Sequence, residues 1–154
     1  MNSEKKDIFD KIMSLPLLRV FYPFYRAHKE VLLYLFFGVV TTLVSFVSFW
    51  VLADLLLINE HPANLISWVL AVLTAFFTNR TWVFEAKNTT EPFLWQMAKF
   101  FASRLSTLGV EEVIIYVFIT RLDFPNMPVK IAASVLIVIL NYVLSKLLVF
   151  TKRK

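Results

Sequence analysis

Four long apolar segments constrain the fold of this chain more than any other feature of its sequence. The clearest is Val31–Ala53, which contains no charged residue. A helix of about 20 apolar residues crosses the roughly 30 Å hydrocarbon core of a bilayer. We therefore predict an all-α membrane protein with four transmembrane helices, at about residues 31–58, 63–84, 93–119 and 128–150. The segments are too long for strands and show no alternation of polar and apolar residues.

The composition supports a membrane environment and argues against several classes of protein. Hydrophobic residues make up 58% of the 154 residues and charged residues 18%, whereas about 25% charged residues is usual in soluble domains. Cysteine is absent, and there are two histidines and two glycines. We therefore expect no metal centre, thiol nucleophile or nucleotide-binding loop. Glu111 and Glu112 are adjacent on one segment and cannot flank a scissile bond, so neither an enzyme nor a cofactor is expected.

The distribution of basic residues predicts the direction in which the chain crosses the membrane. Cytoplasmic ends of membrane helices are enriched in Lys and Arg. Thirteen such residues fall on one side of the four predicted spans, namely Lys5, Lys6, Lys11, Arg19, Arg26, Lys29, Arg80, Lys87, Lys99, Lys146, Lys152, Arg153 and Lys154. The other side has only Arg121 and Lys130. We predict that both termini are cytoplasmic, and that the net charge of +5 attracts anionic lipid rather than nucleic acid.

The segments divide the chain into one transmembrane domain and two flanking pieces. We predict a cytoplasmic or interfacial segment over residues 1–30, a single four-helix domain over residues 31–151, and a basic tail over residues 152–154. In the first piece, Ile8, Phe9, Ile12 and Met13 share one helical face. This pattern favours an amphipathic helix in the membrane interface over a disordered tail.

Two parts of the sequence resemble each other and indicate an internal duplication. Asn79–Phe84 matches Ser145–Phe150, with a basic residue followed three positions later by Val-Phe. Phe36-Phe37-Gly38 similarly matches Phe100-Phe101-Ala102. Each half would contain two crossings, so the halves would be two tandem parallel two-helix repeats. Chance matching of apolar residues is the alternative explanation.

Polar residues inside the spans recur at helical spacing. Thr41 and Ser45 share one face of the first span, and Asn141 lies in the fourth. Small hydroxyl residues often serve only to pack helices in lipid, and Asn141 fits either interhelical bonding or contact with a ligand. The third span differs because Arg104, Thr107 and Glu111 share one face. A charge at mid-helix costs roughly 2.5–3.5 kcal/mol on insertion scales, so these charges form either a structural ion-pair network or a site for transport or binding.

Four basic residues in the predicted spans lie in the cytoplasmic halves of their helices, namely Arg80, Lys99, Arg104 and Lys146. Cations at one level suit an anionic headgroup from the inner leaflet, and Arg can bind phosphate through two hydrogen bonds. Asn79, beside Arg80, offers a further hydrogen bond. Lys99 and Lys146 can instead extend to the interface.

The pattern of spans and repeated motifs resembles the GtrA-like family of small bacterial membrane proteins. The motifs that carry the resemblance are the aromatic-small stretches Phe36-Phe37-Gly38 and Phe100-Phe101-Ala102 and the span endings Asn79–Phe84 and Ser145–Phe150. The resemblance covers about residues 31–151. The sequence departs from the family pattern at two places. At Tyr34-Leu35-Phe36 a basic residue is expected beside the Phe, and at Ser145-Lys146 the family has Asn-Arg.

The resemblance implies a protein of the bacterial cytoplasmic membrane that moves a polyprenyl-phosphate-linked monosaccharide to the outer leaflet, where the sugar is added to a cell-envelope polymer. On this reading, the residues expected to bind the phosphate are Arg104, Arg80, Asn79 and Lys146. Those expected to meet the sugar or line its path are Glu111, Glu112, Asn141, Thr41, Ser45 and Thr107. A homodimer or larger assembly and membrane glycosyltransferases are the expected partners.

Two other functions remain open from the sequence. A small proton-coupled multidrug exporter would use Glu111 or Glu112, although Arg104 on the same face would repel a cationic drug. A non-transporting scaffold for a glycosyltransferase would use Arg104 and Glu111 as ion pairs at an interface.

Overall fold

The computed structural model describes residues 7–15, 18–84 and 91–150, and this part of the chain is helical with no strand. A short helix, α1 (Ile8–Met13), is followed by a single 3₁₀ turn at Arg19–Phe21. The long helices are α2 (Tyr22–Trp50), α3 (Glu60–Thr78), α4 (Phe93–Ile115) and α5 (Asn126–Leu144). The all-α fold predicted from the apolar segments is confirmed.

The four long helices each end in a wide π-helical turn. These turns are η2 (Val51–Leu55), η3 (Asn79–Val83), η5 (Tyr116–Arg121) and η6 (Ser145–Val149). In η3 and η6 the final amide donates to the carbonyl five residues earlier, from Phe84 to Asn79 and from Phe150 to Ser145, at 2.9 Å in both cases. The two segments that match in sequence therefore have the same local structure. The Leu56 and Leu122 amides bind the Val51 and Val117 carbonyls in the same way at the ends of η2 and η5, so the duplication stays a prediction.

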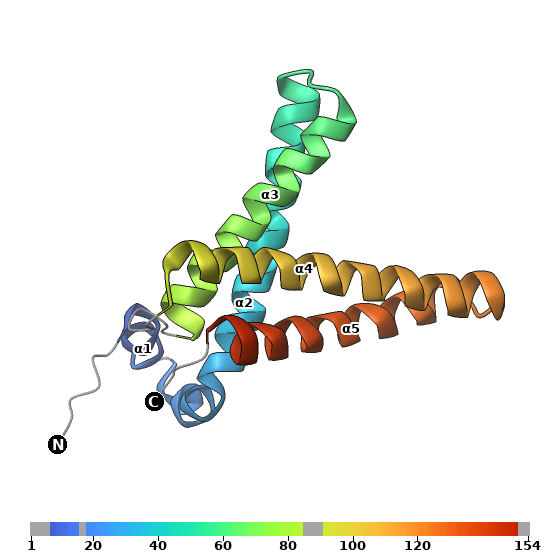
Figure 1. Cartoon of the computed structure of the whole chain (residues 1–154). Coiled ribbons are helices and arrows are strands. Elements are labelled where there is room, and N and C mark those ends of the chain that lie inside the picture. Colours follow the sequence, from blue (N-terminus) through green and yellow to red (C-terminus); the bar gives the residue numbers. More distant parts are fainter. Residues whose placement is uncertain (1–6, 16–17, 85–90, 151–154) are drawn as a thin grey trace.

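The long helices form two hairpins that diverge from a common base (Figure 1). α2 packs along α3, and α4 packs along α5, whereas α3 and α4 make few contacts. The α1 helix lies at the base, and the tips of the two hairpins are far apart (Figure 1). The angle between the hairpins creates the space in which the candidate site lies.

Three of the helices in the described part of the chain are long and apolar enough to cross a membrane, at Tyr22–Leu55, His61–Val83 and Ile131–Val149. α4 is not among them, and it carries Lys99, Arg104, Glu111 and Glu112. That α4 crosses the membrane, as the third of the four predicted spans, therefore stays a prediction.

α2 begins earlier than the sequence indicates, at Tyr22 rather than near Val31. Pro23 lies in the first turn, where its missing amide hydrogen costs nothing. The helix is kinked at His28, where φ is −121° and ψ is 19°. The segment expected to be interfacial therefore continues into the first long helix.

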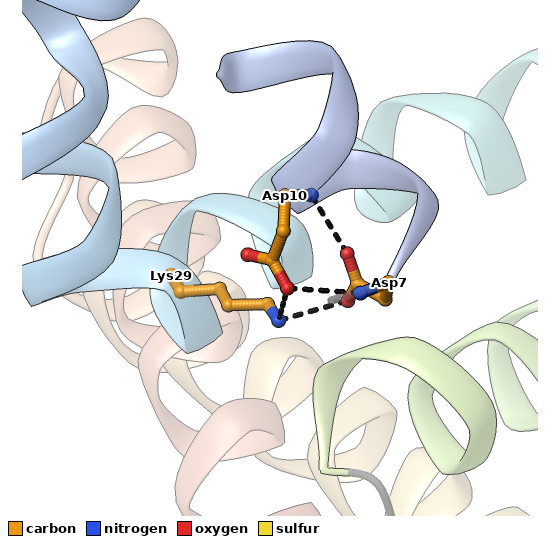
Figure 2. Close-up of polar contacts among 3 residues, drawn as sticks. All are labelled: Asp7, Asp10 and Lys29. Atoms are coloured by element: carbon orange, nitrogen blue, oxygen red, sulfur yellow. Dashed lines mark hydrogen bonds and ion pairs between the residues drawn. The ribbon is translucent and has the colours of Figure 1, made fainter. Parts of the chain in front are cut away.

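The α1 helix is held against the base of the hairpins by an ion pair and an aromatic contact. Lys29 Nζ lies 2.8 Å from a carboxylate oxygen of Asp7 and 2.9 Å from one of Asp10 (Figure 2). Asp7 also caps the helix, because its side chain accepts a hydrogen bond from the Asp10 amide. The Phe9 ring meets Phe37 with a centroid separation of 5.6 Å and Trp82 at 6.4 Å.

A buried aromatic cluster joins the two hairpins. Phe84 and Phe150 are stacked with ring centroids 5.2 Å apart, and Phe76 meets Phe100 at 5.6 Å. All four rings are at most 7% exposed. Phe84 and Phe150 each follow one of the equivalent π turns, so the two matching segments meet through their last residues.

Candidate functional site

A cavity of about 700 Å³ lies in the angle between the two hairpins. We call it the hairpin cavity. Its polar lining comes from α2, α4, α5 and η3, and consists chiefly of Tyr34, Thr41, Thr42, Ser45, Asn79, Arg104 and Asn141. Phe37, Trp68, Val72 and Val138 are among its apolar walls. The cavity therefore places a cation and several hydrogen-bonding groups in apolar surroundings.

Arg104 supplies the positive charge. Its Nη1 donates to the hydroxyl of Tyr34 at 3.4 Å, and its Cζ lies 4.8 Å from the centre of the Phe100 ring. Among the described residues, no carboxylate pairs with this guanidinium. A cation in apolar surroundings is costly unless an anion compensates it, so the site is suited to a negatively charged ligand.

Asn79 contributes an unused hydrogen-bonding group. Its side chain is 3% exposed, and Oδ1 has no partner among the described residues. Buried polar atoms are rarely left unpaired. Because Asn79 lines the hairpin cavity, a ligand with a hydroxyl or amide hydrogen would satisfy this atom.

Asn141 is fixed by a contact between α4 and α5. The Thr107 hydroxyl lies 2.8 Å from Asn141 Oδ1, and Thr107 is 2% exposed. When the amide oxygen accepts this bond, the amide nitrogen keeps two hydrogens for other acceptors. Asn141 is therefore oriented for hydrogen bonding at the edge of the cavity.

The hydroxyls of α2 form a less constrained part of the lining. Thr41 donates to the Gly38 carbonyl at 2.8 Å, which leaves its oxygen able to accept a hydrogen bond. Ser45 lies one turn further along the same face. These residues offer weak polar contacts along one wall of the cavity.

Two of the expected phosphate ligands lie outside the cavity lining. Arg80 Nε donates to Gln96 at 3.0 Å, and its guanidinium lies over the Phe93 ring at 5.4 Å. Lys146 pairs with Glu30 at 2.9 Å and donates to the Tyr142 hydroxyl at 3.2 Å. Arg80 and Lys146 are thus occupied by internal partners.

The two glutamates of α4 also lie away from the cavity lining. Glu111 is half-buried and Glu112 is exposed. Glu111 is seven residues beyond Arg104, which corresponds to about 10 Å along the helix. The structure therefore brings Arg104, Asn79, Asn141, Thr41 and Ser45 together on one cavity, and separates them from the two glutamates.

Thr42, which lines the cavity beside Thr41, and three other residues of the site were not identified from the sequence. Tyr34 and Trp68 line the cavity, and Gln96 is fully buried where it binds Arg80. Tyr34 could have been found, because it lies seven residues before Thr41 and so continues the polar face of α2. Trp68 and Gln96 carry no comparable signal, since either fits a packing role.

These features define a class: a small α-helical membrane protein with a cationic, hydrogen-bonding cavity between two helical hairpins. The chain belongs to the family described as GtrA/DPMS, transmembrane domain, whose model matches residues 33–150.

Three bacterial relatives show how far this similarity extends. The chain is 37% identical over 130 residues to the cell wall teichoic acid glycosylation protein GtcA of Listeria innocua, an alignment covering 81% of this chain and 87% of the relative. It is 34% identical over 130 residues to the protein of the same name from Listeria monocytogenes, with the same coverage. It is also 32% identical over 123 residues to the uncharacterized membrane protein YwcD of Bacillus subtilis, covering 79% of this chain and 97% of YwcD.

Proposed function

We propose that the protein moves a polyprenyl-phosphate-linked monosaccharide from the cytoplasmic to the outer leaflet of the bacterial cytoplasmic membrane. The observation that carries this proposal is Arg104, a guanidinium on the hairpin cavity with no carboxylate partner among the described residues. A phosphate is the anion that best fits an arginine accompanied by hydrogen-bonding groups. Two of the relatives are named for teichoic acid glycosylation, so we propose a cell-envelope polymer as the final acceptor of the sugar.

We assign the roles in the cavity as follows. Arg104 binds the phosphate, and Asn79 accepts a hydrogen bond from the adjoining headgroup. Asn141, held by Thr107, and the hydroxyls of Thr41 and Ser45 meet sugar hydroxyls as the head crosses. Binding in the cavity replaces part of the water that the polar head loses on entering the membrane, which lowers the cost of crossing.

The remaining expected ligands take supporting roles in this proposal. Arg80 and Lys146 lie near the base of the hairpins and attract the anionic head before it reaches Arg104. Glu111 and Glu112 lie further along α4 and serve the sugar later in its path. This sequence of contacts requires α4 to cross the membrane as the third of four spans, with both termini in the cytoplasm.

The assembly and the partners complete the proposal. Four helices enclose a cavity only partly, so we propose that a second copy of the chain closes it in a homodimer. A membrane glycosyltransferase supplies or uses the lipid-linked sugar. The protein itself performs no covalent chemistry and needs no metal ion or cofactor.

Export of cationic drugs is less well supported. Such a transporter needs a carboxylate where the cargo binds, whereas the hairpin cavity carries Arg104 and is lined by neither Glu111 nor Glu112. Arg104 would repel a cation. The geometry therefore favours an anionic substrate.

A leaflet-exchange assay tests the proposal. Purified protein is placed in liposomes with a short-chain polyprenyl-phosphate sugar on one side, and accessibility of the sugar on the other side is followed over time. Arg104→Ala should reduce exchange to the level of empty liposomes. Arg121→Ala is the matched control, because Arg121 is exposed, does not line the cavity and donates to the nearby Tyr116 hydroxyl at 2.9 Å.

Two outcomes would count against the proposal. Equal exchange by the wild-type and Arg104→Ala proteins would remove Arg104 from the mechanism. No exchange by the wild-type protein, even with a co-purified glycosyltransferase, would favour the scaffold function.

A further inference from the structure

An apolar groove lies beside the hairpin cavity, between α2 and α5. Its volume is about 520 Å³. Val31 and Leu35 of α2 form one side, and Val135, Val138 and Ile139 of α5 form the other. These five side chains are 42–56% exposed, so the groove is open to the lipid. We call it the α2–α5 groove.

The α2–α5 groove is continuous with the hairpin cavity. Tyr34, Leu35 and Val138 line both spaces. The Tyr34 hydroxyl accepts a hydrogen bond from Arg104, so the polar end of this side chain meets the cation. A ligand with its anion at Arg104 would therefore have its neighbouring atoms beside Tyr34, at the entrance to the groove.

The inner end of the groove has a fixed wall. The Tyr34 and Tyr142 rings meet edge to face with centroids 5.3 Å apart. The Tyr142 hydroxyl in turn donates to Glu30 at 2.7 Å and accepts from Lys146 at 3.2 Å. This network orients the two rings, so the groove has a defined shape where it meets the cavity.

We propose that the α2–α5 groove binds the hydrocarbon chain of the substrate where it leaves the phosphate, while the hairpin cavity holds the phosphate and sugar. This inference rests on the proposed function and adds a chain-binding subsite to it. The order of surfaces in the protein, cationic and then apolar, matches the order of groups in a polyprenyl phosphate.

The attachment of the chain to the phosphate explains why this hydrocarbon would be favoured over ordinary acyl chains. Hydrophobic burial gives no advantage inside a bilayer, because lipid tails already surround the groove. Affinity must come from close packing against its walls and from the high effective concentration of a chain tethered to a bound head. Other lipids can enter the groove, but their headgroups would not be held at Arg104.

Two probes of different chain length test this proposal in detergent-solubilised full-length protein. Geranylgeranyl phosphate has a chain that extends into the groove, and dimethylallyl phosphate has only one isoprene unit. We expect the wild-type protein to bind the long probe at least about tenfold more tightly than the short one. Val135→Trp should fill the groove and weaken binding of the long probe by about tenfold, with little change for the short probe.

Leu136→Trp is the matched control, because Leu136 neighbours Val135 on α5, is 42% exposed and does not line the groove. It should leave both affinities unchanged. Ile139→Trp provides a second groove variant if Val135→Trp does not fold. Arg104→Ala distinguishes the phosphate site from the groove, since it should weaken the binding of both probes by similar factors.

The outcomes distinguish this inference from the proposed function. If Val135→Trp and Ile139→Trp both bind the long probe as well as Leu136→Trp does, the groove is not the chain subsite, although the phosphate site stands. Equal wild-type affinities for the two probes would have the same meaning. If the wild-type protein binds neither probe, both the chain subsite and the proposed phosphate site are wrong.

Discussion

The guanidinium of Arg104 and the hydroxyl of Tyr34 meet at 3.4 Å, although the two residues are 70 positions apart in the chain. The contact joins the α2–α3 hairpin to the α4–α5 hairpin at the edge of the hairpin cavity. Leu35, the neighbour of Tyr34, occupies the place beside Phe36 where the family resemblance leads one to expect a basic residue. Here the second hairpin provides the cation, and Tyr34 provides a neutral group that positions it.

Tyr34→Phe tests this positioning role. The variant keeps the ring against Tyr142 but removes the hydroxyl that accepts from Arg104. Because the bond is long, we expect a loss of at most about 1 kcal/mol in the free energy of unfolding. Exchange of the lipid-linked sugar should fall several-fold, and by less than in Arg104→Ala. Thermal unfolding and the leaflet-exchange assay measure the two effects, and an exchange rate equal to that of Arg104→Ala would show that Tyr34 acts in another way.

Asn79→Ala tests the unpaired amide oxygen on the cavity. Since Oδ1 has no partner among the described residues, its removal should change the free energy of unfolding by less than about 1 kcal/mol. Binding of a sugar-phosphate lipid should weaken by about tenfold. Asn79→Asp should weaken binding further, because a negative charge on the same cavity repels the phosphate.

Ser145→Ala is the matched control for Asn79→Ala. Ser145 begins the equivalent π turn, is fully buried and also has an unpaired oxygen, but it does not line the hairpin cavity. Its removal should leave ligand affinity unchanged. Equal losses of affinity in the two variants would mean that the loss comes from a disturbed π turn, rather than from a lost contact between Asn79 and the ligand.

The Thr107–Asn141 bond can be measured with a double-mutant cycle. Thr107→Val and Asn141→Ala each remove one partner of the 2.8 Å contact. We expect a coupling energy of about 0.5–1.5 kcal/mol in the free energy of unfolding. Chemical unfolding in detergent gives the four free energies. A coupling near zero would mean that the bond does not hold α5 against α4.

The docking of α1 should depend on pH through Asp7. Burial favours the neutral acid, but hydrogen bonds from Lys29 and the Asp10 amide outweigh this effect and lower the pKa of Asp7 below its ordinary value of 3.8. A lowered pKa in the docked state stabilises docking above pH 3.8, and this stabilisation is lost as the pH falls through the lowered pKa. α1 should therefore remain docked at neutral pH and detach only in strong acid.

Hydrogen exchange of the α1 amides provides the measurement for this prediction. Lys29→Met should make these amides exchange faster at pH 7, with the pH dependence near pH 3.8 reduced. Lys11→Met serves as the control on α1, because Lys11 is exposed and takes no part in the contacts drawn in Figure 2. Unchanged protection in Lys29→Met would show that the Phe9 contacts alone hold α1.

The sequence was most informative about helices and about which residues share a face. The spacing of Thr41 and Ser45 predicted a common face, and both line the hairpin cavity. Long apolar runs indicated helices because a helix satisfies its own backbone hydrogen bonds. The cost of a charge in lipid similarly drew attention to Arg104 before any geometry was available.

Depth in the membrane was a poorer guide to the site than rotation about the helix. Arg80 and Arg104 fall at similar predicted depths, yet Arg80 binds Gln96 and Arg104 lines the cavity. Asn79 and Arg80 were both expected to bind the phosphate, but adjacent residues on a helix point about 100° apart, and only Asn79 of the two lines the cavity. The wide turns at the helix ends change this rotation further, and their positions could not be deduced from residue type.

The divergence of the hairpins also has a mechanical consequence. The hairpin cavity lies in the angle between two long arms, so its width is controlled by their opening. A rotation of about 10° would move the end of a 20-residue helix by roughly 5 Å, while displacing residues near the pivot much less. Lateral pressure or a change in bilayer thickness that acts on the distant tips would therefore rotate a whole hairpin and change the width of the cavity at Arg104.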